Sequence, residues 1–133
     1  MSEFHKKTLL LLEDDDVLRR YLAKLLRADQ YVVQETETVA TALAMVKTHA
    51  IDLIIADLKL PDDTAIGLIR RLAHENRRIP VLIITAYGEW ETYLEALDLG
   101  VLDYLNKPIE YTDLREKIES LLGKVEQEYN GQD

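Results

Sequence analysis

The chain has 133 residues, with an apolar fraction of 47% and a charged fraction of 31%, which are the proportions of a single globular domain with one hydrophobic core. Its apolar runs are all far shorter than the roughly 20 residues of a membrane-spanning helix, no secretory apolar segment follows the start, and there is no cysteine to form a disulfide. We therefore expect a cytoplasmic protein that does not enter a membrane. The net charge of −9 argues against direct binding to nucleic acid, whose phosphates this chain would repel, and is compatible with a bound divalent cation.

Apolar runs and helical periodicity alternate along the whole chain. Short apolar runs predict strands at residues 8–12, 31–33, 51–57, 80–84 and 101–105. Apolar residues at helical spacing predict helices at residues 17–26, 39–49, 66–73, 89–99 and 114–122, the first of them capped by Asp15 or Asp16. The chain shows no internal repeat, and its polar tail, residues 124–133, is typical of a frayed helix end or a linker.

Five strand-then-helix units with short links predict an α/β fold, a doubly wound parallel sheet with helices on both faces. Strand order is not visible in a sequence, but the flavodoxin-like order 2-1-3-4-5 places the ends of the first and third strands side by side. With that order, Glu13 and Asp14 lie next to Asp57.

Asp57 ends an apolar run without polar alternation, as expected of a strand buried on both faces. Open α/β sheets bind ligands at the carboxyl ends of such strands. Three carboxylates a few ångströms apart repel one another, and an all-oxygen set suits Mg²⁺. A carboxylate can also attack phosphorus to form an acyl phosphate. Thr85 and Lys107 follow two other strands and would share the charge of a transferred phosphoryl group on the same rim.

The set Glu13-Asp14, Asp57, Thr85 and Lys107-Pro108 resembles the receiver domain of two-component response regulators, the CheY-like superfamily. The resemblance covers about residues 7–122, so we expect a receiver domain at residues 1–123. It implies that Asp57 accepts a phosphoryl group from a sensor histidine kinase or a phosphotransfer protein, and that Thr85 and Lys107 bind the phosphoryl oxygens.

The same resemblance implies the metal ligands. Asp14 and Asp57 would bind Mg²⁺, Glu13 would act largely through water, and the backbone carbonyl of Lys59 would complete the protein ligands. The domain would not be an enzyme in its own right, since it would assist only its own phosphorylation and dephosphorylation.

Tyr104 falls on the aromatic switch position of the family, where the ring turns inward when the hydroxyl at the Thr85 position moves to the phosphoryl group. The resemblance then implies an output face made by the fourth helix, the last strand and the fifth helix, read by a homodimer partner or an effector. Trp90 and Tyr93 mark a partner surface on that helix if they are exposed, and core packing is the alternative. The runs 85–88 and 99–105 are more similar to receivers of transcriptional regulators.

Two positions depart from the family pattern. The Gly usual eight residues after the phosphoacceptor is replaced by Ala65, with Gly67 nearby, so we expect the loop after Asp57 to take a different backbone path into the third helix. Lys59 and Tyr87 border the route of water to the acyl phosphate and should tune its lifetime.

Two other functions are alternatives to a receiver domain that is switched by phosphorylation of Asp57. A phosphatase of the haloacid dehalogenase type also uses an aspartyl phosphate and Mg²⁺, but it carries a second Asp two residues after the nucleophile, where this chain has Lys59. A degenerate receiver that acts only as a protein-interaction module is the other alternative, and the retained acidic, hydroxyl and lysine positions count against it.

Overall fold

The computed structural model describes residues 5–86 and 103–130. Five parallel strands form a single sheet in the order β2-β1-β3-β4-β5, which confirms the predicted doubly wound topology. The strands are β1 (Thr8–Leu12), β2 (Val32–Thr36), β3 (Leu53–Asp57), β4 (Val81–Thr85) and β5 (Asp103–Asn106).

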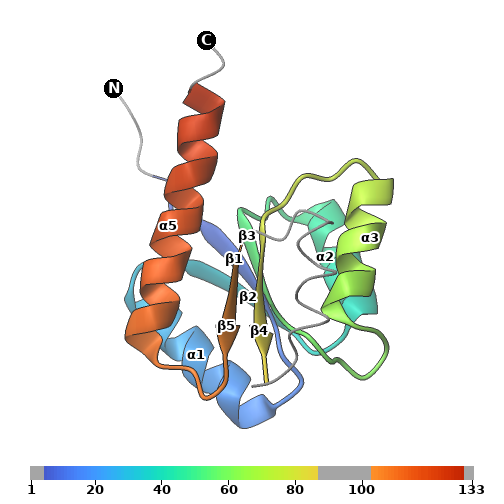
Figure 1. Ribbon diagram of the computed structural model, residues 1–133, viewed down its shortest axis with the longest axis horizontal. Coiled ribbons are helices and arrows are strands. Elements are labelled where there is room, and N and C mark those ends of the chain that lie inside the picture. The colour runs from blue at the N-terminus through green and yellow to red at the C-terminus, as the bar shows by residue number, and fades with distance from the viewer. Residues whose placement is uncertain (1–4, 87–102, 131–133) are drawn as a thin grey trace.

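Helices cover both faces of this sheet. In the described ranges these are α1 (Asp16–Ala28), α2 (Val39–Thr48), α3 (Ala65–His74) and α5 (Tyr111–Asn130). Helices α1 and α5 lie on one face, and α2 and α3 lie on the other (Figure 1). The predicted helix at residues 89–99, with Trp90 and Tyr93, falls outside the described residues. No helix in the described ranges is long and apolar enough to cross a bilayer.

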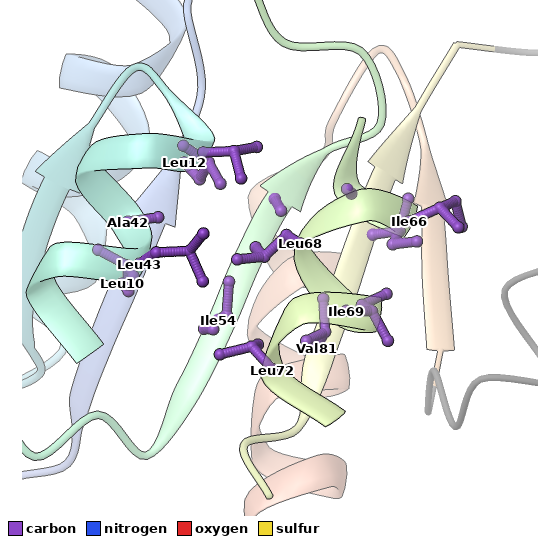
Figure 2. Close-up of a cluster of buried hydrophobic side chains, with 14 of the residues drawn as sticks. Leu10, Leu12, Ala42, Leu43, Ile54, Ile66, Leu68, Ile69, Leu72 and Val81 are labelled. Atoms are coloured by element: carbon purple, nitrogen blue, oxygen red, sulfur yellow. The ribbon is translucent and has the colours of Figure 1, made fainter. Parts of the chain in front are cut away.

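The hydrophobic core is divided into two layers by the sheet. Successive residues of a strand point to opposite faces, so Leu10 and Leu12 pack against α2 and α3, whereas Leu9 and Leu11 pack against α1 and α5. Figure 2 shows the first layer, in which side chains of α2 and α3 meet those of the strands, among them Ile54. Both layers exclude water, and this is why the central strands lack polar alternation.

Helix starts follow the capping residues in the sequence. Asp15, rather than Asp16, caps α1, because its Oδ1 accepts from the Leu18 amide at 3.1 Å. Thr38 and Thr64 cap α2 and α3 in the same way.

Two elements extend furthest beyond their predicted ends. Strand β2 runs to Thr36 rather than residue 33, because its polar residues pair with β1 at the edge of the sheet and carry no apolar signal. Helix α5 continues through Asn130, so most of the polar tail extends a helix.

Candidate functional site

The strand register gathers the predicted site residues at one edge of the sheet. Leu12 pairs with Ala56, so the next residues along each strand, Glu13 and Asp57, come side by side. Thr85 pairs with Asn106 at the ends of β4 and β5, and the Lys107 amide donates to the Thr85 carbonyl at 2.8 Å. The carboxyl ends of four parallel strands thus bring together an acid pair, an aspartate, a hydroxyl and an ammonium.

Glu13, Asp14 and Asp57 form one carboxylate cluster. One oxygen from each lies within 4.8 Å of the others. Glu13 is fully buried, the Asp57 side chain is 13% exposed, and Asp14 is exposed. The cluster therefore runs from the protein interior to solvent, which gives a small ion a way in.

Lys107 joins the two less exposed carboxylates. Its Nζ lies 2.8 Å from Glu13 Oε1 and donates to Asp57 Oδ2 at 3.1 Å. Partial burial lowers the pKa of Lys107, but its two carboxylate partners outweigh that effect, and the net pKa is raised. Lys107 is therefore a cation in the site.

Burial and neighbouring charges act in opposite directions on the pKa of the Glu13 side chain. Burial raises its pKa to about 6, with a further contribution from the charge of Asp57, against the lowering effects of Lys107 and of the Asp15 amide, which donates to Oε2 at 3.1 Å. A buried carboxylate with a raised pKa lies at the candidate site, as is common at functional sites.

The residues of this cluster fit a divalent cation. With all groups ionised, three carboxylates and one ammonium leave two uncompensated negative charges. All potential ligand atoms are oxygens, and the cluster is open to water through Asp14, as Mg²⁺ requires for its retained waters. The predicted Mg²⁺ site is thus chemically consistent with the arrangement.

The two predicted switch residues lie on neighbouring strands. Thr85 is the last residue of β4 and is buried, with its hydroxyl donating to the Ala86 carbonyl at 3.3 Å. Tyr104 lies on β5 opposite Ile83, and its half-buried ring packs against the α2/α3 layer of the core.

The loop after Asp57 is held at several points. The Ala65 amide donates to the Leu58 carbonyl at 2.9 Å, and Ala65 is fully buried without a left-handed backbone, so glycine is not required there. Lys59 bridges to Thr64 across the loop. Asp63 lies over Gly67, where the Cβ of any other residue would overlap the Asp63 carboxylate.

The structure adds two residues that the sequence interpretation missed. Arg19, on the inner side of α1, is a buried cation that donates to the Glu13 carbonyl. A sequence signal existed, since Arg19 lies three and four residues before the buried Leu22 and Ala23, on the apolar face of the helix. Asp62 accepts from two amides at the start of α2, a contact between distant segments with no local signature.

A doubly wound five-stranded sheet with a carboxylate cluster at the ends of its strands is the arrangement expected of a receiver domain. Comparison with known families supports this class. The family model described as the response regulator receiver domain matches residues 9–119. The chain therefore belongs to the receiver domain family of two-component response regulators.

Curated relatives are longer than this chain. The two-component response regulator PhoP of Pseudomonas aeruginosa is 35% identical over 114 residues, which cover 86% of this chain and 51% of that protein. The transcriptional regulatory protein ZraR of Escherichia coli K12 is 35% identical over 119 residues, covering 89% of this chain and 27% of that protein. The chain thus spans about half or a quarter of these relatives.

Solved structures match nearly the whole chain. The signal receiver domain of a LuxO repressor protein from Vibrio parahaemolyticus has a TM-score of 0.89 at 25% identity, covering 97% of this chain and 99% of that one. A CheY-like receiver domain protein from Methanospirillum hungatei has a TM-score of 0.87 at 29% identity, covering 93% and 99%. The CheY-like fold is therefore confirmed.

Proposed function

We propose that this receiver domain accepts a phosphoryl group on Asp57 and thereby switches the surface that a partner reads. The observation that carries the proposal is the convergence of Asp57 with Glu13, Asp14 and Lys107 at the ends of neighbouring strands. The donor is a phosphohistidine of a sensor histidine kinase or a phosphotransfer protein, in keeping with the family.

The chemistry is a transfer between two nucleophiles. A carboxylate oxygen of Asp57 forms a bond to phosphorus while the bond from phosphorus to the donor imidazole breaks, and the departing nitrogen takes up a proton. Lys107 already contacts Asp57, so its ammonium stands where the added negative charge develops. Thr85, buried at the end of β4, supplies a hydroxyl on the same rim.

Glu13, Asp14 and Asp57 would hold Mg²⁺, with the Lys59 carbonyl as a further ligand. When bound, the cation would neutralise the carboxylates and the phosphoryl oxygens during transfer. The acid cluster itself orients Asp57, since Lys107 ties it to Glu13.

Thr85 and Tyr104 are the proposed bistable element. Thr85 ends β4, and Tyr104 lies on the neighbouring β5 against the core, so a movement of the hydroxyl would change the space beside the ring. The output would be a homodimer or an effector bound at β5, α5 and the helix expected at residues 89–99. The relative ZraR is a transcriptional regulatory protein, and control of transcription is the output that we propose for the natural protein.

Acetyl phosphate tests the phosphoacceptor directly. The chain is incubated with Mg²⁺ and acetyl phosphate, and its intact mass is measured beside those of Asp57→Asn and Asp62→Asn. The control, Asp62, is an aspartate in the loop that follows the same strand. We expect the wild type and Asp62→Asn to gain one phosphoryl group and Asp57→Asn to gain none.

Either of two results would refute the assignment. A gain of mass in Asp57→Asn would place the phosphoryl group elsewhere. If the folded wild type gains no mass, the result would favour a degenerate receiver that acts only as a protein-interaction module. The retained site residues argue against that alternative.

A further inference from the structure

Arg19 is a buried cation that touches the main chain of the metal site. Its side chain is 8% exposed, and its Nη1 donates to the Glu13 carbonyl at 3.0 Å. The same guanidinium pairs with Asp16 at 2.6 Å and with Glu35 and Glu37 at 3.3 Å each. A buried guanidinium with four oxygen partners, in the turn after β1, on α1, on β2 and just after β2, is held in one orientation.

The bond to the Glu13 carbonyl acts on the turn that carries two of the three carboxylates. The Glu13 carbonyl and the Asp14 amide belong to the same planar peptide unit, so fixing one fixes the other. On the other side of the residue, the Glu13 amide donates to the Thr36 carbonyl at 3.1 Å. The peptide plane that leads into Asp14 is therefore held by Arg19 at the Glu13 carbonyl, and the Glu13 amide before it is held by Thr36.

We propose that Arg19 is a positioning residue for the Mg²⁺ site, which holds the peptide unit between Glu13 and Asp14 so that both carboxylates face Asp57. The inference rests on the proposed function, since it concerns the metal of that site. Partners that orient metal ligands without touching the metal raise affinity because the ligands need not be ordered on binding.

The charges around Arg19 argue against a role in binding the phosphoryl group itself. Its carboxylate partners on α1, on β2 and after β2 outnumber its single charge, and its donors are used within that cluster. Lys107, in contrast, contacts the cluster of candidate ligands directly. Arg19 thus acts on the site through the backbone.

Arg27 offers a matched control on the same helix. It also pairs with Glu35, at 3.0 Å, and donates to a main-chain carbonyl, that of Val33, at 2.8 Å. It has no contact with the turn at residues 13–14 among its described partners. Arg27→Met therefore removes an arginine that shares the Glu35 partner and also bonds a main-chain carbonyl, but it leaves the proposed positioning bond intact.

The experiment measures Mg²⁺ binding by calorimetry without any phosphodonor, in the wild type, Arg19→Met and Arg27→Met, and urea denaturation gives the stability of each. We expect Arg19→Met to raise the Mg²⁺ dissociation constant by about tenfold or more. Arg27→Met should bind as the wild type does, even where it is similarly destabilised. If Arg19→Met does not fold, Arg19→Lys keeps a cation, but with all its donors on one nitrogen it cannot reproduce the three-nitrogen contacts of the guanidinium, and it should still bind Mg²⁺ more weakly than the wild type.

The outcomes separate this inference from the proposed function. A wild type that does not bind Mg²⁺ refutes the proposed metal site. A wild type that binds, with folded Arg19 variants that bind equally well, overturns the positioning role alone. Equal weakening by Arg27→Met would also overturn it, because the effect would then follow from lost stability.

Discussion

Glu13 is the residue at which burial and charge oppose each other most directly. It has no exposed surface, yet it lies between an aspartate that repels its charge and a lysine that stabilises it. Burial dominates, and the pKa of Glu13 is raised to about 6. In the absence of a divalent cation, the ionised form of this side chain is therefore costly to the folded state.

This raised pKa predicts a pH dependence of stability in metal-free buffer. The folded state holds the proton of Glu13 more tightly than the unfolded state does, so the stabilisation is fully present below the unfolded-state pKa. It is lost as the pH rises through about 6. Relative to Glu13→Gln, which does not titrate, the wild type should lose unfolding free energy as the pH rises from 4.5, the ordinary pKa of a Glu side chain, to about 6.

Urea denaturation with EDTA at a series of pH values measures this difference. Parallel profiles for the two proteins would show that Glu13 does not titrate in that range. Adding Mg²⁺ should remove the decline in the wild type, because a cation would replace the proton as the compensating charge.

One aspartate, Asp62, holds the start of helix α2 to the loop that follows β3. Asp62 Oδ1 and Oδ2 accept from the Val39 and Ala40 amides, each at 2.9 Å, while Thr38 accepts from the Thr41 amide. These bonds satisfy amides that a helix start leaves without partners, and they lower the pKa of Asp62. The loop that carries Lys59 is thereby tied to the start of another element.

We expect Asp62→Ala to lower the unfolding free energy by about 1 kcal/mol, the usual cost of losing a helix-capping side chain. Asp62→Asn keeps an acceptor oxygen and should lose less. Denaturant titrations at neutral pH compare the three proteins. Equal stability of Asp62→Ala and the wild type would mean that water replaces the carboxylate at the helix start without cost.

Docking of α5 on α1 uses a polar contact as well as the core. The Tyr111 hydroxyl donates its one proton to Asp29 Oδ2 at 2.5 Å, and the same oxygen lies 3.2 Å from the Leu25 carbonyl. Burial, followed by the bond to Asp29 and its charge, raises the pKa of Tyr111, which keeps the donor proton on the ring oxygen. The start of α5 is thus attached to the end of α1, on the face of the sheet opposite α2 and α3.

At the scale of the whole molecule, the site couples metal binding to folding. The carboxylates come from β1 and β3 and their connecting turns, and they meet only when the sheet is formed. A ligand that binds the folded state alone stabilises it by mass action.

Mg²⁺ should therefore raise the thermal unfolding temperature of the wild type. At a concentration one hundred times the dissociation constant, the gain in unfolding free energy is about 2.7 kcal/mol. Asp14→Ala should show little of this gain, since it lacks a predicted direct ligand. Circular dichroism melts at matched ionic strength test this, and equal gains in both proteins would indicate screening by salt instead of a site.

Much of the fold was predictable because burial leaves a periodic trace in the sequence. The apolar runs of β1, β3 and β4 and the aspartate cap of α1 mark their elements locally. Strand β2 was predicted too short, because an edge strand partly in water needs no apolar run. The contacts of Arg19 and Asp62 were missed, because each joins segments that are distant in sequence.

The sequence by itself determined the class of protein and the residues available for its chemistry, because residue types and local periodicity can be seen in the sequence without knowledge of the fold. Only the tertiary structure decided which of these residues meet. The strand register places Glu13 beside Asp57. Packing of the elements brings Lys107 into contact with both carboxylates and lets Arg19 donate to the Glu13 carbonyl. Such pairings depend on how whole elements pack together, and so they appear only when the sheet and its helices are assembled.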